Sequence, residues 1–193
     1  MARFTDKVII VTGAASGIGA ATAQRFANEN AKLVLCDLDG DNLKRVADRL
    51  ESGDVMTQTT DVSGFADCEA LVAATLERFG RIDVLVNNAG KDHLSRLDEG
   101  DISDFSKVID ADLYGVFHMS RAAIAALRET RGCIVNTSSA SGLGGDWNHS
   151  FYCAAKGAVS NFTRALALDH GGEGVRVNAV CPSLTRSELT ESM

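Results

Sequence analysis

The chain has few of the features that would place it in a membrane, in a secretory pathway or on nucleic acid. It carries 19 basic residues against 26 acidic ones, for a net charge of −7, and they form no basic cluster. This balance argues against nucleic acid and anionic membranes as partners. No apolar run approaches the length of a membrane span. Residues 1–7 lead directly into a strand-like segment, so we expect no signal peptide.

Signals for metal sites and disulfides are also missing. The five cysteines are odd in number, widely spaced and contain no C-x-x-C pair, and the four histidines are equally scattered. This spacing predicts reduced thiols in a cytoplasmic protein, with neither a disulfide framework nor a metal site. The composition, 45% hydrophobic and 23% charged residues, is typical of a soluble globular protein. Because no linker or repeat interrupts it, we expect a single domain over residues 1–193.

Short β-branched runs alternate along the chain with amphipathic helical patterns. We expect strands at 8–11, 32–36, 55–60, 82–86, 132–137 and 175–180. We expect helices at 18–26, 43–50, 65–79 and 151–166, and one long helix from 103 to 128. This alternation, with short connections, predicts an α/β fold: a Rossmann-type, doubly wound parallel sheet flanked by helices. Ligands bind such sheets at the carboxyl ends of the strands.

The first expected strand ends in a glycine-rich loop, Gly13-Ala14-Ala15-Ser16-Gly17-Ile18-Gly19, at the mouth of a helix. Glycines there let the backbone approach a diphosphate, and the helix N-terminus offers free N–H groups and a positive dipole end. Taken alone, such a loop is equally explained by a tight turn. Its position between strand and helix favours a dinucleotide site.

An acidic residue, Asp37, ends the second expected strand, about 20 residues past that loop. A carboxylate at this place can accept hydrogen bonds from both ribose hydroxyls of an adenosine, and it repels a 2′-phosphate. No Arg or Lys directly follows Asp37 or lies within the glycine loop. The sequence therefore favours NAD over NADP, although a plain polar residue at a strand end is the alternative.

The segment 139–156 carries a hydroxyl, a phenol and an amine. Tyr152 and Lys156 are four residues apart on an expected helix, so they share one face. A phenol titrates near pH 10, and its pKa must fall by about 3 units, roughly 4 kcal/mol, before it can act as a general base at neutral pH. A lysine ammonium one helical turn away favours the phenolate, and Ser139 can donate a hydrogen bond to a substrate oxygen. By itself, the Tyr–Lys spacing also fits a surface pair on an amphipathic helix.

Together these motifs resemble the NAD-dependent branch of the short-chain dehydrogenase/reductase family. The matching segments follow the family's order and spacing along the whole chain: 12–19, Asp37, Asp61-Val62, Asn87-Asn88-Ala89-Gly90, Ser139, Tyr152 and Lys156. The resemblance implies that Tyr152 is the acid/base, that Lys156 lowers its pKa and binds the nicotinamide ribose, and that Ser139 positions the substrate oxygen. It also implies dinucleotide contacts from Gly13, Ser16, Gly17, Ile18, Gly19, Asp37, Leu38, Asp61, Val62, Asn88, Ala89, Gly90, Tyr152, Lys156, Pro182 and Ser183.

Within the family, residues 132–139, 142–147 and 152–184 resemble the bacterial meso-2,3-butanediol (acetoin) dehydrogenases. This likeness implies reversible hydride transfer between NAD and a secondary alcohol, with a small vicinal diol as the best candidate, in a homo-oligomer of two or four subunits. A small, partly apolar substrate pocket would be lined by Ser139, Gly142, Leu143, Trp147, His149 and Tyr152. Trp147 and His149 fit a subunit contact or the surface equally well. A polyol, a hydroxyacyl or a hydroxysteroid substrate, and a catalytically silent NAD-binding module, are the alternatives.

The first departure from the family's pattern is Asp112, which stands where the family has a catalytic Asn. An Asn there holds a water that relays protons from the lysine. An ionised Asp only accepts hydrogen bonds, and its charge is expected to raise the pKa of Lys156 and to oppose the effect of that lysine on Tyr152. Our hypothesis is that the relay survives through a backbone carbonyl and water.

Two further departures lie near the end of the chain. Pro182-Ser183 replaces the family's common Pro-Gly, and Ser187 takes the position of a threonine that binds the nicotinamide carboxamide. The sequence stops at Met193, short of the family's customary end. We therefore expect a shortened chain that lacks the last strand of the sheet and part of the substrate lid.

Overall fold

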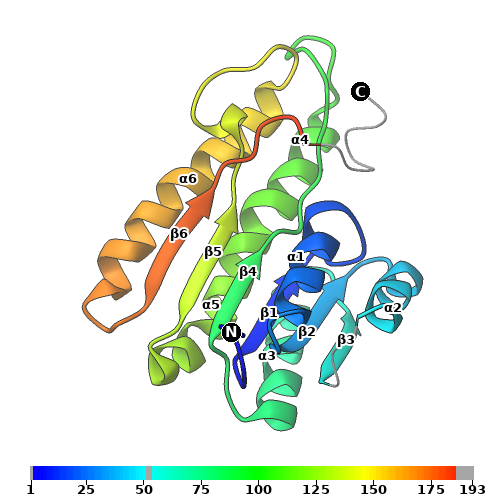
Figure 1. The fold of residues 1–193 in the computed structure, drawn as a ribbon. Helices are drawn as coiled ribbons and strands as arrows, with labels where there is room; N and C mark the ends of the chain where they lie inside the picture. Colours follow the sequence, from blue (N-terminus) through cyan, green and yellow to red (C-terminus); the bar gives the residue numbers. More distant parts are fainter. Residues whose placement is uncertain (1, 51–53, 186–193) are drawn as a thin grey trace.

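Six parallel strands form one sheet in the computed structural model, which describes residues 2–50 and 54–185 (Figure 1). The strands are β1 (Val8–Thr12), β2 (Lys32–Asp37), β3 (Val55–Thr59), β4 (Val84–Asn87), β5 (Cys133–Thr137) and β6 (Arg176–Val180). They lie in the order β3-β2-β1-β4-β5-β6, and all neighbours run parallel. The predicted Rossmann-type sheet is therefore confirmed. Since β1 has β2 on one side and β4 on the other, the chain reverses its direction of winding at β1, where such folds open a ligand crevice.

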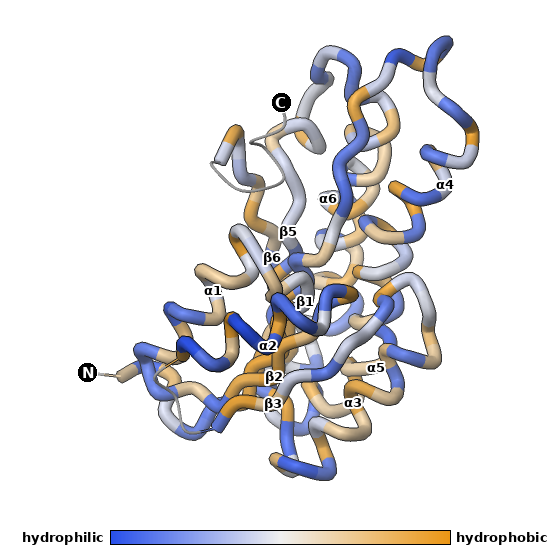
Figure 2. Tube along the Cα trace, turned by 90° about the vertical axis from the view of Figure 1, so that its right-hand side faces the viewer, coloured by the Kyte–Doolittle hydropathy of each residue, from blue (hydrophilic) through white to orange (hydrophobic). Residues whose placement is uncertain are grey.

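Helices cover both faces of the sheet. They are α1 (Gly17–Ala27), α2 (Gly40–Asp48), α3 (Phe65–Phe79), α4 (Ile102–Ile109), α5 (Gly115–Thr130) and α6 (Ser150–Gly171). Apolar residues of α1 and α2 pack on one face, and those of α3, α5 and α6 pack on the other. Figure 2, turned by a quarter from Figure 1, shows α1 on one side of the strands and α3 and α5 on the other side. In the described residues no helix is both long and apolar enough to cross a membrane.

The central position of β1 in the sheet explains why residues 8–11 are a continuous run of β-branched residues. Val8 and Ile10 belong to the core that lies under α3 and α5, whereas Ile9 and Val11 belong to the core under α1 and α2. Successive side chains point to opposite faces of a strand, so a central strand covered on both faces must be apolar throughout. All five residues of β1 are buried.

The prediction of a single long helix from 103 to 128 is wrong for the middle of that segment. The structure has α4, then a π-helical turn (Asp110–Tyr114), and then α5. An inserted residue of this kind re-aims the side chains around it, and such turns are frequent at functional sites. Gly115 at the start of α5 packs against Val62, where a Cβ would lie 2.6 Å from the valine Cγ2. This contact comes from a distant part of the chain, so local periodicity carries no sign of it.

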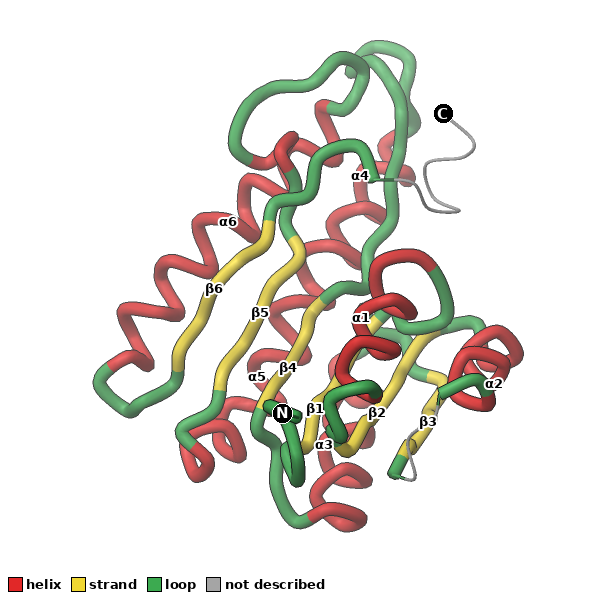
Figure 3. The backbone as a smooth tube through the Cα atoms, in the orientation of Figure 1, coloured by secondary structure: helices red, strands yellow, loops and turns green. Residues whose placement is uncertain are grey.

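The loops at the carboxyl ends of the strands gather at one end of the sheet (Figure 3). One of them contains a short 3₁₀ turn (Ala140–Gly142) between β5 and α6. The strand β6 lies at the edge of the sheet, and no described strand pairs with its free side. Ser187 and Met193 lie outside the described residues.

Candidate active site

A cleft of about 530 Å³ opens at the carboxyl ends of the strands. Fourteen of the residues singled out in the sequence line it: Gly13, Ser16, Gly17, Ile18, Asp37, Asn88, Ala89, Gly90, Ser139, His149, Tyr152, Lys156, Pro182 and Ser183. They come from the ends of β1, β2, β4, β5 and β6 or the turns that follow them, from the start of α1, and from α6 and its N-cap. A parallel sheet brings these turns together, because all of its strands end at the same edge.

The glycine turn after β1 is shaped by close backbone packing. Gly13 has φ +64°, and a Cβ there would lie 2.7 Å from the Cα of Ala89. The amide of Asn88 donates to the carbonyl of Gly13 at 3.2 Å and so ties the turn to the end of β4. Ser16 is the N-cap residue of α1, yet its side chain makes no capping bond. A free hydroxyl beside a helix N-terminus suits an anionic ligand such as a diphosphate.

The carboxylate of Asp37 is fixed at the end of β2. One oxygen accepts the N–H of Ala15 at 2.9 Å, and the other accepts the N–H of Asp39 at 3.0 Å. Each carboxylate oxygen can accept further hydrogen bonds, so the group remains able to bind the two hydroxyls of a ribose. The glycine turn, the helix N-terminus and this carboxylate are groups that could hold a dinucleotide.

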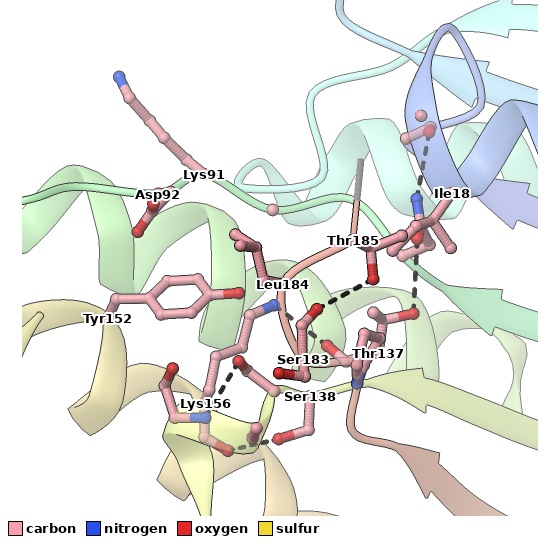
Figure 4. Close-up of a pocket in the computed structure, with 18 of the residues that line it drawn as sticks. Ile18, Lys91, Asp92, Thr137, Ser138, Tyr152, Lys156, Ser183, Leu184 and Thr185 are labelled. Carbon is pink, nitrogen blue, oxygen red and sulfur yellow. Dashed lines mark hydrogen bonds between the residues drawn. The ribbon is translucent and has the colours of Figure 1, made fainter. Parts of the chain in front are cut away.

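Tyr152 and Lys156 point into the same part of the cleft. Figure 4 shows the phenol oxygen and the lysine nitrogen directed to the region beside Leu184. The Nζ of Lys156 lies 5.5 Å from the centroid of the Tyr152 ring. It donates to the carbonyl of Thr137 at 3.1 Å, and the lysine is only 3% exposed. The helical spacing that predicted a shared face thus also produces a buried ammonium beside the phenol.

The phenol of Tyr152 is held in its protonated form in the free protein. Its pKa is raised to about 12, mainly by burial and then by the charge of Asp112, while a hydrogen bond with Ser139 partly opposes this rise. This net direction is the opposite of the lowering that a general base needs at neutral pH. The phenol is therefore poised as an acid, and the step to a base requires added positive charge in the cleft.

Asp112 lies in the π-helical turn and is fully buried beneath the catalytic candidates. Its Oδ1 accepts the N–H of Lys91 at 2.6 Å, while its Oδ2 lies 3.6 Å from Nζ of Lys156 and has no hydrogen-bond partner. Burial raises the pKa of this carboxyl, and the charge of Lys156 opposes that effect. Gly90 leaves room for the pair, since a Cβ there would lie 2.7 Å from Oδ1 of Asp112 and 3.2 Å from Nζ of Lys156.

Comparison with known protein families identifies the family to which these motifs belong. Residues 7–193 match the sequence profile of the family described as short chain dehydrogenase. The chain belongs to the short-chain dehydrogenase family. A meso-2,3-butanediol dehydrogenase of Serratia marcescens is 48% identical over 188 residues, which are 97% of this chain and 75% of that protein. A levodione reductase of Leifsonia aquatica is 40% identical over 98% of this chain and 73% of its own length.

Solved structures of the family share the fold closely. The crystal structure of a levodione reductase has a TM-score of 0.94 at 39% identity, and the match covers 98% of this chain and 76% of the other. A 3-ketoacyl-(acyl-carrier-protein) reductase from Brucella melitensis, crystallised with NADH, has a TM-score of 0.92 at 34% identity, over 97% and 79% of the two chains. The family predicted from the motifs is therefore confirmed, and so is the prediction that the protein is an oxidoreductase.

Several residues predicted for the site of this short-chain dehydrogenase lie outside the lining of the cleft: Gly19, Leu38, Asp61, Val62, Asp112, Gly142, Leu143 and Trp147. Trp147 is 90% exposed and Leu143 is 63% exposed, so neither side chain faces into the cleft's interior. Gly142 packs against the backbone of Lys156, with a virtual Cβ 2.6 Å from its carbonyl carbon. Ser187 falls among the residues that the structure does not describe.

Other residues line the cleft that the sequence did not single out. They are Lys91, Asp92, Thr137, Ser138, Ala140, Ser141, Gly145, Asp146, Leu184 and Thr185. The most buried carboxylate of this group is Asp92, whose side chain is 8% exposed. Asp92 follows the Asn87-Asn88-Ala89-Gly90 motif by two residues. This position, just after the end of a strand, is the sequence feature from which its place in the cleft could have been predicted.

Proposed function

We propose that the protein is an NAD-dependent oxidoreductase that interconverts a secondary alcohol and a ketone, with a small vicinal diol such as 2,3-butanediol and its hydroxyketone, acetoin, as the substrate pair. The observation that carries this proposal is that Ser139, Tyr152 and Lys156 share one cleft with the glycine turn and Asp37. The 48% identity to a meso-2,3-butanediol dehydrogenase supports the choice of a diol. The chemistry that NAD supplies when bound is hydride acceptance at a positively charged ring.

The protein's own residues bind and orient the reactants. The turn from Gly13 to Ser16 and the N-terminus of α1 hold the diphosphate, and Asp37 accepts hydrogen bonds from the ribose. Lys156 donates to ribose hydroxyls at the other end of the cofactor. Ser139 donates to the substrate oxygen and stabilises the charge that develops on it during the reaction.

Tyr152 carries the proton. In the reductive direction the protonated phenol donates to the ketone oxygen, which matches its raised pKa of about 12 in the free protein. In the oxidative direction the phenolate accepts the hydroxyl proton. The positive charge that an oxidised nicotinamide would bring beside Lys156 would lower the pKa of the phenol for that step.

Replacement of Tyr152 with Phe tests the proposal. The variant keeps the ring and loses the acid/base, so turnover of 2,3-butanediol should fall by about 100- to 10,000-fold. NADH binding, followed by fluorescence titration, should stay close to that of the wild type. A variant that turns over at the normal rate would refute the assignment of Tyr152. A wild-type protein that binds NADH and oxidises no alcohol would instead indicate a silent binding module.

We also propose that the protein works as a homo-oligomer. An apolar hollow lies on the outer surface of α5, α6 and the π-helical turn, and it is lined by Leu113, Tyr114, Phe117, His118 and Phe162. Phe117 and Tyr114 remain 45% and 49% exposed, and exposed apolar patches of this kind mark contact surfaces. Light scattering of the purified protein should give two or four subunits, and the mass of a single chain would contradict the proposal.

A further inference from the structure

Two side chains at the substrate end of the cleft neither carry the proton nor bind the oxygen that reacts. They are Asp92, in the loop after β4, and His149, the N-cap residue of α6. The Oδ2 of Asp92 lies 3.4 Å from Nε2 of His149, and their side chains are only 8% and 14% exposed. Figure 4 shows the Asp92 carboxyl turned toward the ring of Tyr152, whereas the neighbouring Lys91 extends away from the cleft. The imidazole of His149 lies 6.0 Å from the same phenol ring, measured between centroids.

The two loops that carry this pair are joined to each other. The N–H of Ser95 donates to the carbonyl of Asn148 at 2.6 Å, and a parallel bridge links Ser95 with His149. His93 stacks on Phe151 of α6 at a centroid distance of 5.8 Å. Side chains that are fixed in this way before a ligand arrives bind it with little further loss of conformational entropy.

The hydrogen bonds of the pair leave two acceptors face to face. The Nδ1 of His149 lies 3.0 Å from the carbonyl oxygen of Trp147. A carbonyl oxygen only accepts, so Nδ1 must carry the proton, and in the neutral ring Nε2 then presents a lone pair to Asp92. Asp92 Oδ1 already accepts the N–H of His93 at 2.8 Å. Its Oδ2 and the Nε2 of His149 are therefore both acceptors, with no hydrogen between them in that state.

From this arrangement we propose that Asp92 and His149 bind the second hydroxyl of a vicinal diol, on the carbon next to the one that reacts. This inference rests on the proposed function and names the feature of the substrate that the site selects. A hydroxyl oxygen about 2.8 Å from Oδ2 of Asp92 can donate its one hydrogen to that carboxylate oxygen, and His149, whose Nε2 lies 3.4 Å from Oδ2, forms the neighbouring wall of the site. Ser139 and Tyr152 hold the first oxygen, and the pair holds the second.

The same pair serves both partners of the reaction. The hydroxyketone keeps the second hydroxyl while the first oxygen changes between alcohol and ketone. A mono-alcohol of equal length leaves a buried carboxylate oxygen without its donor, and an unpaired buried group of this kind is costly. Selectivity for diols over mono-alcohols therefore depends on Asp92 and His149.

The test compares meso-2,3-butanediol with 2-butanol, which has the same carbon chain and one hydroxyl fewer. We expect the ratio of kcat/KM for the diol to that for the mono-alcohol to fall by about 10- to 100-fold in Asp92→Ala and in His149→Phe. Asp92→Asn keeps the acceptor for His93 and loses the charge, so it should give a smaller fall, and it decides the question if Asp92→Ala does not fold. Asp98→Ala is the matched control, because Asp98 is 69% exposed on the same loop; its ratio should equal that of the wild type.

Three results would overturn the inference. The first is an equal loss on both alcohols, which indicates a general structural effect. The second is an unchanged ratio in the Asp92 and His149 variants. The third is a preference for 3-amino-2-butanol over the diol, which means that an ammonium group occupies the site. If no alcohol is oxidised at all, the proposed function fails, and saturation-transfer NMR of both alcohols on the protein with NADH still decides whether Asp92 favours the diol.

Discussion

Gly142 offers a sharp test of how the catalytic candidates are held in place. An ideal Cβ on this residue would lie 2.6 Å from both the carbonyl carbon and the oxygen of Lys156, and 2.9 Å from its Cβ. Gly142 does not have a positive φ, so alanine there brings no backbone strain and acts only through this contact. Because ordinary van der Waals contact begins near 3.4 Å, the 3₁₀ turn and α6 must separate by about 0.8 Å to admit the methyl group.

The size of the effect follows from that displacement. Overpacking of this kind costs about 1–3 kcal/mol. For a chain of this length each kcal/mol lowers Tm by about 2–4 °C, so we expect Gly142→Ala to melt roughly 2–12 °C below the wild type. The turn begins directly after Ser139, so the same movement pulls Ser139 away from Lys156. A misplacement of about 1 Å can reduce the rate 100-fold, and we expect kcat to fall by about 10- to 100-fold.

The assay is a thermal melt together with steady-state kinetics of 2,3-butanediol oxidation. Gly144→Ala is the matched control, since Gly144 lies in the same loop and no atom comes within 4 Å of its virtual Cβ. If Gly142→Ala melts and turns over like Gly144→Ala, the packing argument is refuted. If only the KM for the alcohol changes, Gly142 touches the substrate, as the sequence predicts.

Three further changes test single charges. Asp112→Asn removes a charge that raises the pKa of Tyr152, so the rise of kcat with pH for alcohol oxidation should move to lower pH by about one unit; an unchanged pH profile would make Asp112 a bystander. For Asp83, burial raises the pKa, but ion pairs led by Arg81 lower it on balance. Its stabilisation is therefore complete above the ordinary pKa near 3.9 and is lost as the pH falls through the folded value. Asp83→Asn should cost about 1–3 kcal/mol in urea unfolding at pH 7, and an equal cost at low pH would contradict this reasoning. Asp37→Ser should raise kcat/KM for NADP relative to NAD by about tenfold or more, and an unaltered ratio would show that Asp37 does not select the cofactor.

The sequence predicted those features that depend only on residues close together in the chain. The strands of a parallel sheet are buried on both faces, so runs such as 8–11 stand out as continuous apolar segments. Polar and glycine residues directly after those runs lie at the carboxyl edge of the sheet, where the cleft opens. The spacing of Tyr152 and Lys156 on one helix needed no knowledge of the rest of the fold.

The features that were missed depend on contacts between distant segments. The π-helical turn lies where Gly115 packs on Val62. The apolar residues of α4 and α5 are spaced like those of one uninterrupted helix, so their periodicity does not reveal the turn. In the sequence Asp92 is an ordinary acidic residue of a loop. In the structure His149, at the start of α6, packs beside it, and its side chain is only 8% exposed. For Trp147 the sequence left a pocket, a subunit contact and the surface equally open, and the side chain is 90% exposed in the loop before α6. Local patterns therefore indicate which strand end carries a residue, but tertiary contacts decide whether it faces the cleft.

The carboxylates around the phenol connect the fold with the direction of the chemistry. Asp112 and Asp92 both raise the pKa of Tyr152, in addition to the effect of burial. Asp112 is kept there by the π-helical turn, and Asp92 by the joined loops at the substrate end. Added positive charge in the cleft would lower that pKa. The surroundings of Tyr152 therefore favour its protonated form, the state in which a phenol can donate a proton.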